Sequence, residues 1–379
     1  MIRILQVIGS LNSGGSQSMI MNIYRNIDRK KIQFDFIIHK KDEVSYSEEI
    51  RRLGGKIYVL PQYKVYNVFS FKKAWNNFFK KHPEYKVIHG HVRSTASIYL
   101  KIAKKYGLYT IAHSHNTSSG KGISAIIKNI LQYRIRYVAD YFIGCSKESA
   151  EWLFGKKIAN SDRCTILNNA IDTKKYLYNE NTREKLRKEF NIKKEDKLIG
   201  NVGRFSYVKN HKFLIQIFEE ICKKSNNYKL ILIGDGKLRE EIEELVKRKK
   251  LEDKVIFTGV RKNINEILQA IDIIVMPSIY EGLPVALVEA QSASLPCLIT
   301  DTITDEVDIT ELIYREKLRE EPNVWANDIV DILNNFNRET VKDVELKIKK
   351  HGYDIETTTN NIETIYLNGI EKLKEREQN

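Results

Sequence analysis

Residues 277–290 read PSIYEGLPVALVEA and follow an apolar run, 271–276, that predicts a buried strand. Pro284 suits the first turn of a helix, whose leading N–H groups have no partner within the helix. Glu281 then lies in the loop before that helix and Glu289 lies inside it. Carboxylates accept hydrogen bonds from sugar hydroxyls, and a helix start favours phosphate. The two kinds of group occur together in a nucleotide-sugar.

Short apolar runs recur along the whole chain with longer helical patterns between them, and this rhythm of β-α-β units predicts parallel sheets. It restarts after a polar, charge-dense stretch at 172–196. We therefore expect an α/β protein with two doubly wound domains, 1–178 and 179–354, and an amphipathic closing helix in 355–379. Ligands of such sheets lie beyond the carboxyl ends of the strands, so the natural site is a cleft between the domains.

The composition is that of a soluble globular protein, with 42% hydrophobic and 30% charged residues among 379. This excludes disordered and fibrous classes. No apolar run approaches the ~18 residues of a membrane span, and the apolar start is too short for a signal peptide. The four cysteines have neither disulfide-framework nor zinc-ligand spacing. We expect a cytoplasmic protein.

The net charge of +14 is unevenly distributed: residues 1–178 carry +18 and residues 179–379 carry −4. A basic half suits nucleic acid, an anionic membrane surface or a phosphorylated substrate, or it is only a solvated lysine-rich surface. No nucleic-acid reader module or pattern of stacking aromatics accompanies the charge, which argues against nucleic acid.

A glycine-rich turn, 9–17, follows the first predicted strand and offers backbone N–H groups to an anion or a polar ligand. Gly15 stands where a P-loop needs its lysine, and the dinucleotide pattern G-x-G-x-x-G is absent. NTPase and NAD-binding functions are therefore disfavoured. Gly14 and Gly15 either approach a ligand or only make a tight turn.

Histidines end two predicted strands, as His89-Gly-His91 and His113-Ser-His115. Histidine pairs raise the question of a metal, but no acidic cluster or third spaced ligand accompanies them, so we expect none. Because the carboxyl end of a parallel strand faces the ligand, His113 or His115 is a candidate site residue.

A second basic turn follows the strand 198–202, where Gly203-Arg204 is followed five residues later by Lys209. Arginine supplies forked donors and lysine a point charge, so together they suit a diphosphate and the charge that gathers on a phosphate leaving group.

With these motifs the chain resembles the family 4 retaining glycosyltransferases of the GT-B fold. The most specific element is E-x7-E, from Glu281 to Glu289, supported by the Gly203-Arg204 turn, by IGDG at 233–236, by FTGVR at 257–261 and by NNAID at 168–172. The resemblance implies two Rossmann-like domains that face each other across a deep cleft, with the C-terminal helix returning to the first domain.

The same resemblance implies roles for individual residues. Arg204, Lys209 and Gly203 would hold the donor diphosphate and Glu289 the ribose. Glu281 with the backbone of Gly282 and Leu283 would hold the transferred sugar, and Arg261 would border the base. In the first domain, Gly14 and Gly15 would approach the donor and acceptor, and His115 would contact the donor sugar, with His113 as the alternative.

Three positions depart from the family pattern: Asn116, Ala170 and Ser294 stand where an acidic residue and two glycines are usual. They affect loops and remove no phosphate or sugar ligand.

The implied function is retaining transfer of a hexose or N-acetylhexosamine from a nucleotide-sugar, most simply a UDP-sugar, to a lipid-linked polysaccharide precursor. No Asp-x-Asp motif occurs in the chain, so neither a metal nor a cofactor is expected. The basic first domain would dock on the inner face of an anionic membrane. A nucleotide-sugar 2-epimerase and a non-catalytic nucleotide-sugar-binding partner share the fold and are the alternatives.

Overall fold

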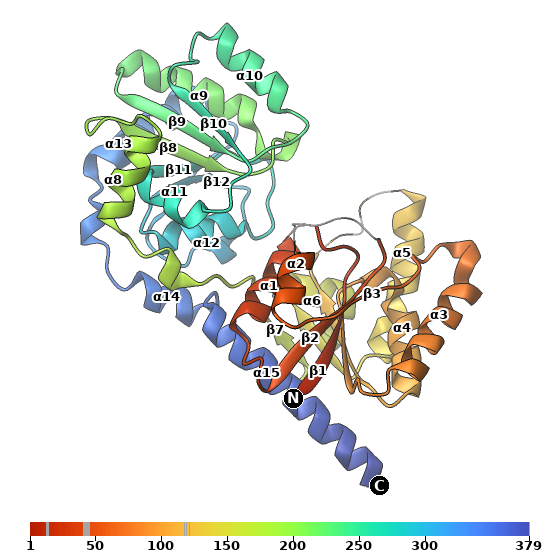
Figure 1. Ribbon diagram of the computed structural model, residues 1–379. Coiled ribbons are helices and arrows are strands. Elements are labelled where there is room, and N and C mark those ends of the chain that lie inside the picture. The colour runs from red at the N-terminus through yellow and green to blue at the C-terminus, as the bar shows by residue number, and fades with distance from the viewer. Residues whose placement is uncertain (13–14, 41–45, 117, 119, 121, 379) are drawn as a thin grey trace. The chain divides into compact units, whose positions relative to one another are not determined.

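The computed structural model describes residues 1–378 except 13–14, 41–45, 117, 119 and 121. The chain divides into two compact units, Met1–Ala170 with Asp354–Asn379 and Ile171–Tyr353 (Figure 1). The boundary falls after Ala170, ahead of the expected boundary after residue 178. The reason is local packing, because Ile171 lies in an apolar cluster with Val288 of the second unit.

The first unit is built on a seven-stranded sheet with the order β3-β2-β1-β4-β5-β6-β7. Every neighbouring pair is parallel. The strand order reverses between β1 and β4, and a crevice at such a point is where open α/β sheets bind ligands. The strands are β1 Ile2–Val7, β2 Ile32–Ile38, β3 Ile57–Val59, β4 Val87–Gly90, β5 Tyr109–Ser114, β6 Tyr141–Gly144 and β7 Cys164–Ile166.

Helices cover both faces of this sheet. They are α1 Gly15–Asn26, α2 Ser47–Arg52, α3 Val68–Lys81, α4 Arg93–Lys105, α5 Ile123–Tyr133, α6 Lys147–Phe154, α7 Lys156–Ala159 and α15 Ile355–Gln378, with short 3-10 turns at η1 Val65–Asn67 and η2 Arg134–Tyr137. One core lies under α1 and α15 and the other under α3, α4 and α6. The C-terminal helix therefore belongs to the first unit, as expected.

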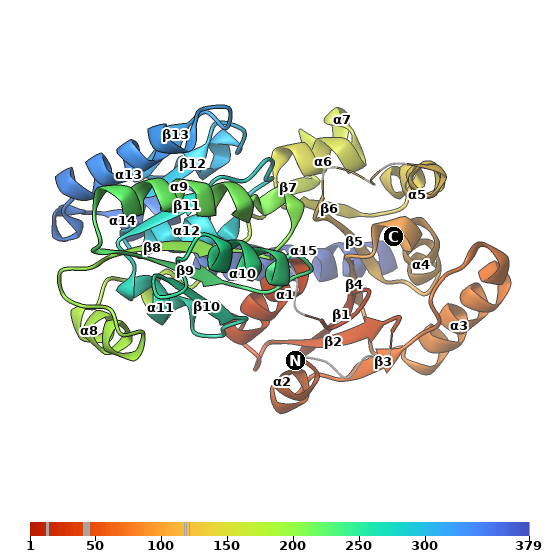
Figure 2. The ribbon, with the colours of Figure 1, turned by 90° about the horizontal axis from the view of Figure 1, so that it is seen from above.

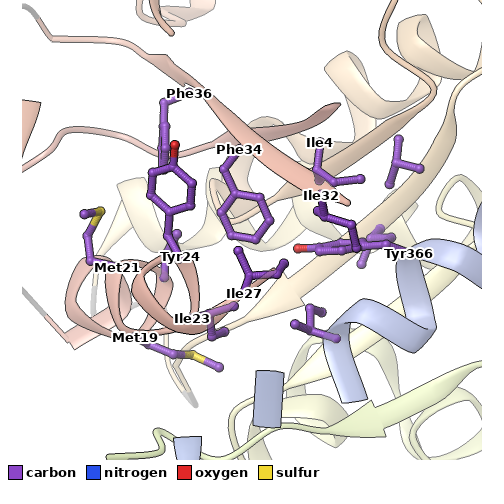
Figure 3. Packing of buried hydrophobic residues seen from close by; sticks show 14 of the residues in the cluster. Ile4, Met19, Met21, Ile23, Tyr24, Ile27, Ile32, Phe34, Phe36 and Tyr366 are labelled. Carbon is purple, nitrogen blue, oxygen red and sulfur yellow. The ribbon is translucent and has the colours of Figure 1, made fainter. Parts of the chain in front are cut away.

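Aromatic packing holds α15 against the sheet (Figure 3). The Tyr24 ring of α1 stacks on Phe34 of β2 with a centroid separation of 5.2 Å, and Tyr366 of α15 meets Phe34 edge-on at 5.9 Å. A Cβ on Gly369 would lie 2.5 Å from the Tyr109 ring, so only glycine lets α15 approach β5 this closely. The close approach makes α15 part of the core of the first unit.

The second unit is a six-stranded parallel sheet with the order β10-β9-β8-β11-β12-β13. The strands are β8 Lys197–Val202, β9 Tyr228–Ile233, β10 Val255–Gly259, β11 Ile273–Met276, β12 Cys297–Thr300 and β13 Ile313–Glu316. The helices are α8 Glu180–Glu189, α9 His211–Lys224, α10 Arg239–Arg248, α11 Ile264–Ala270, α12 Val285–Ser292, α13 Pro322–Asn335 and α14 Val344–Lys350, with 3-10 turns η3 Thr173–Lys175, η4 Tyr207–Lys209, η5 Asp305–Val307 and η6 Arg338–Thr340. Figure 2 shows α9 and α13 together on one face, and α8 and α11 pack on the other.

Two glycines bring the loops after β8 and β9 into contact. Gly234 has φ +142°, and a Cβ there would lie 2.0 Å from the carbonyl oxygen of Gly203.

We expect Gly234→Ala to lower the free energy of unfolding by roughly 2–4 kcal/mol, because the side chain would collide with backbone. Calorimetric Tm measures the loss. Gly282→Ala, where a Cβ would meet nothing within 4 Å, is the control, and equal stability of the two variants would contradict this account.

Candidate functional site

The loops at the carboxyl edge of the second sheet are tied to one another by backbone hydrogen bonds. The loop after β11 is held to the turn after β8, since Ile279 N–H donates to the Val208 carbonyl at 2.8 Å. Glu281 forms an isolated parallel bridge with Ile303, which follows β12. The loops after β8, β11 and β12 contain glycines and short polar residues, and the parallel sheet brings these loops together at one edge.

Lys209 and Glu281 form an ion pair at this edge. Lys209 Nζ lies 2.7 Å from Glu281 Oε1, and both side chains are largely buried, with 17% and 16% of their surfaces exposed. Lys209 ends η4, and the left-handed Asn210 turns the chain from there into α9. Both residues were expected at the donor site, but their contact with each other was not. A bound diphosphate and a sugar would share this pair between them, the phosphate on the ammonium and the hydroxyls on the carboxylate.

Arg204 lies in the same loop, and its side chain is exposed. Gly203 precedes it and leaves room for the lysine, because a Cβ at Gly203 would lie 3.0 Å from Lys209 Cε. Two cations therefore flank a backbone that carries no side chain at this point. That arrangement suits a group with two negative charges.

The helix that carries the second glutamate begins one residue later than expected. Pro284 is the N-cap of α12 with φ −77° rather than part of its first turn, and the helix runs from Val285 to Ser292. Gly282 before it is exposed and Leu283 is half-buried. The start of α12 thus follows directly on the Glu281 loop, as the motif predicts.

Glu289 lies on α12 and accepts a hydrogen bond from Tyr176. The Tyr176 hydroxyl donates to Glu289 Oε1 at 2.7 Å. Burial raises the pKa of Glu289 to about 7, and the Tyr176 hydrogen bond opposes part of that rise because it stabilises the ionised form. Glu289 is thus a carboxylate poised to change its charge near neutral pH.

This contact predicts a pH dependence for ligand binding. Hydroxyl donors bind the ionised carboxylate best, so affinity for a ribose-containing ligand should rise as pH increases through about 7, the pKa of Glu289. Tyr176→Phe removes the hydrogen bond that lowers this pKa, so the rise should move to higher pH. Calorimetric titration with UDP on either side of neutrality measures the shift. An unchanged profile would show that Glu289 does not control binding.

Arg261 lies apart from this group. Its guanidinium pairs with Glu189 Oε1 at 3.2 Å, donates to Asn263 and lies over the Phe190 ring, 5.9 Å from its centre. Among the described residues, these contacts reach the end of α8 and no other expected site residue. Arg261 follows β10, at the carboxyl edge of the second sheet.

In the first unit, the glycine-rich turn leads into α1, which begins at Gly15. A Cβ at Gly15 would meet nothing within 4 Å, so the backbone there is open. Gly14, the other glycine expected to approach a ligand, lies outside the described residues.

A cavity of about 260 Å³ also opens at the carboxyl edge of the first sheet. Residues that follow β1, β2, β3 and β4 line it, among them Gly9, His39, Gln62 and Val92. Apart from Gly9, which belongs to the glycine-rich turn 9–17, sequence reasoning did not single out these residues, because each is ordinary in its own stretch and only the parallel sheet gathers them.

Four imidazoles from β4, β5 and the residues that follow them pack together at this edge. His89 Nε2 lies 3.1 Å from His113 Nδ1, and His91 Nδ1 lies 2.8 Å from His115 Nε2. Burial lowers the pKa of His89 to about 3 and that of His115 to about 4, and it lowers the pKa values of the other two well below the usual range. All four rings are therefore neutral at neutral pH.

Gln6 of β1 sets the tautomers of one pair. Its amide nitrogen donates to the Tyr366 hydroxyl at 3.0 Å, so its oxygen must accept from His91 Nε2 at 2.9 Å. A neutral imidazole carries one N–H, so His91 Nδ1 accepts from His115 Nε2. The lone pair of His115 is then on Nδ1, which is suited to accept a hydrogen bond from a sugar hydroxyl.

Of the two candidate site histidines, His115 is the more accessible. His113 is buried with 2% of its surface exposed, while His115 at the strand end is half-buried. The expectation that no third ligand accompanies the histidine pairs is wrong, because β4 and β5 are neighbours and bring His89, His91 and His113 within reach of one ion. Of their nitrogens, however, all but His113 Nε2 already contact one another, His115, Gln6 or Tyr366.

Family models match both halves of the chain. Residues 13–175 match the model described as "Glycosyltransferase Family 4", and residues 182–311 match the one described as "Glycosyl transferases group 1". The two matches meet near the boundary between the units, so each unit corresponds to one model.

Individual relatives agree with the family models. EpsF of Bacillus subtilis (strain 168), a protein named as a glycosyltransferase, is 33% identical over 98% of this chain and 97% of its own length. A Campylobacter jejuni transferase is 31% identical over 43% of this chain and 42% of its own; it is named for adding N-acetylgalactosamine to a saccharide on diphospho-undecaprenol. The fold matches that of HepE from Anabaena, solved with UDP and glucose, with a TM-score of 0.76 at 16% identity over 96% of this chain and 99% of that one.

Proposed function

The chain belongs to the family 4 glycosyltransferases of the GT-B fold, and from that premise we propose that it is a retaining enzyme that transfers a hexose or N-acetylhexosamine from a UDP-sugar to a glycan carried on a lipid diphosphate. The observation that carries the proposal is the buried Lys209–Glu281 pair beside the start of α12. It offers a cation for phosphate and a carboxylate for sugar at one place.

The donor would lie along the carboxyl edge of the second sheet. Arg204 and Lys209 hold the diphosphate, with Gly203 giving it room, and the carboxylate of Glu289 binds the ribose hydroxyls. Glu281 and the backbone of Gly282 and Leu283 hold the sugar, and Arg261 borders the base. The preference for uridine rests on HepE, which was solved with UDP-glucose.

The reaction would proceed on one face of the sugar. The bond between the anomeric carbon and the diphosphate oxygen breaks while the bond to the acceptor oxygen forms on the same face. The leaving diphosphate takes the acceptor's proton. Arg204, Lys209 and the start of α12 balance the charge that develops on it. Nδ1 of His115 accepts from a sugar hydroxyl and orients the ring.

The acceptor would bind the first unit. This unit holds 31 Lys and Arg against 17 Asp and Glu, so it carries the whole net charge of +14. The 260 Å³ cavity at its carboxyl edge offers space for a saccharide. The named acceptor of the Campylobacter relative supports a lipid diphosphate as the carrier. Peripheral association with an anionic membrane surface would bring such an acceptor within reach.

The proposal predicts activity without a divalent ion or a cofactor. Because protein cations and a helix start balance the leaving group, turnover of UDP-sugar should persist in EDTA, and the anomeric configuration of the product should match that of the donor. Proton NMR of the product reads both results in one experiment. Loss of turnover in EDTA that magnesium or manganese restores would contradict the mechanism, and so would an inverted product.

A further inference from the structure

A stripe of exposed apolar side chains runs along α5 and η2 in the first unit. It consists of Ile126, Ile130, Tyr133 and Tyr137, which are 59%, 67%, 51% and 74% exposed. Their spacing of four, three and four residues keeps them on one side of a helix. Residues 123–139 include Lys128, Arg134 and Arg136 but no acidic residue. Neighbouring exposed apolar side chains are unusual on the surface of a monomeric protein, and here every charged residue of the segment is a cation.

The stripe lies on the outer side of this segment. The inner side contributes Ala125, Gln132 and Ile135, which are buried. α5 lies against α4, and Ser97 of α4 donates to the Leu131 carbonyl at 2.9 Å (Figure 1). The segment therefore has its core contacts already, and the stripe is additional apolar surface.

A basic pocket lies at the end of the stripe. It measures about 430 Å³, and its lining includes Tyr137 of the stripe and five cations, Lys104, Arg136, Arg163, Lys372 and Arg376. Asp140 is the one carboxylate among the residues that line it. The pocket lies at the amino edge of the sheet, since β5 and β6 begin there at Tyr109 and Tyr141.

The carboxylate in the pocket does not neutralise it. Asp140 Oδ1 contacts Lys104 Nζ at 2.8 Å and Arg376 at 3.0 Å, and Oδ2 accepts from the backbone and hydroxyl of Thr110. With five cations and one anion, the lining keeps an excess of four positive charges. A phosphate group suits this excess of positive charge, and the pocket has room for more than the phosphate itself.

We propose that the α5–η2 stripe and the basic pocket together form a surface that docks on an anionic lipid bilayer, with the apolar side chains entering the interface and the pocket taking a lipid phosphate. An amphipathic segment with a cationic rim binds bilayers through buried apolar area plus attraction to anionic headgroups. The inference rests on the proposed function, because docking would bring the protein to its lipid-linked acceptor.

Cosedimentation with vesicles tests the surface directly. The full chain should bind vesicles of phosphatidylglycerol and phosphatidylcholine, and bind phosphatidylcholine alone much more weakly. Ile126→Ser with Ile130→Ser should lower binding at least tenfold. Arg163→Gln with Lys372→Gln should lower it about fivefold per charge and weaken its dependence on salt.

A matched pair in the same unit serves as the control. Val65 and Phe69 are 66% and 84% exposed but lie on η1 and α3, so Val65→Ser with Phe69→Ser should bind as the wild type does. All variants should keep UDP-induced thermal stabilisation, which shows that they are folded. Equal vesicle binding by the stripe variant and the wild type would overturn the proposal. So would a loss of vesicle binding in the Val65 and Phe69 control but not in the stripe variant. Vesicle binding without any nucleotide binding would instead leave the surface intact and overturn the proposed function.

Discussion

Lys209→Ala should lower kcat for sugar transfer by about 10²–10³, the usual cost of removing one group that stabilises charge in a transition state. Lys209 is largely buried against Glu281, so its ammonium is held in place before the leaving diphosphate gathers charge. The loss should fall on kcat more than on KM, since the charge on the leaving group grows during the reaction. Steady-state release of UDP from a UDP-sugar measures both constants.

Two further variants make this result specific. Lys212→Ala removes a neighbouring lysine of α9 that pairs with Glu241 at the surface, and it should leave turnover unchanged. Lys209→Arg keeps the charge but changes its shape, and it should recover only part of the activity. Wild-type turnover in Lys209→Ala would remove this residue from the mechanism.

Glu289→Ala should abolish most of the stabilisation that nucleotide-sugar gives to the protein. A ligand at about 100 times its Kd stabilises the folded state by roughly 2.7 kcal/mol, which a thermal shift detects readily. Glu289 is the acceptor proposed for the ribose hydroxyls, and its neighbour Tyr176 has only one hydroxyl to offer in its place. The variant should therefore need far more UDP to reach the same Tm.

The unliganded variants separate binding from folding. Because burial raises the pKa of Glu289 to about 7, ionising it costs stability in the folded state as pH rises from its ordinary range through 7. Glu289→Gln cannot ionise, so above neutrality it should be at least as stable as the wild type before ligand is added. Glu244→Gln, on the exposed side of α10, should respond to UDP as the wild type does. A full response to UDP in Glu289→Ala would place the ribose elsewhere.

The repeating strand-and-helix pattern predicts most of the fold, because buried parallel strands read as apolar runs. Two edge strands give a much weaker signal in the sequence than the others. β7 has only three residues, Cys164–Ile166, and β13 reads IYRE with a charged half, so neither contains an apolar run long enough to recognise. The boundary between the units was also placed late, because the stretch after Ala170 is polar and reveals nothing of its packing on α12.

The residues of the proposed donor edge could be chosen from local motifs, since E-x7-E and the Gly-Arg turn each lie in one stretch of chain. The contacts that tune the site could not. Tyr176 reaches Glu289 across 113 positions, and Gln6, His91 and Tyr366 meet only because the sheet and α15 gather them. No spacing in the sequence predicts such contacts. The histidines of β4 and β5 therefore read as two separate pairs, although their rings pack together in the structure.

The most direct test of sugar transfer is the release of free UDP from a panel of UDP-sugars, measured with and without an acceptor on a lipid diphosphate. We expect one UDP-sugar to yield UDP in proportion to the acceptor added, and Lys209→Ala to yield almost none. Conversion of the nucleotide-sugar without UDP release would instead indicate an epimerase. A UDP-sugar that binds but is never consumed, whatever acceptor is supplied, would indicate a non-catalytic binding protein and contradict the proposed function.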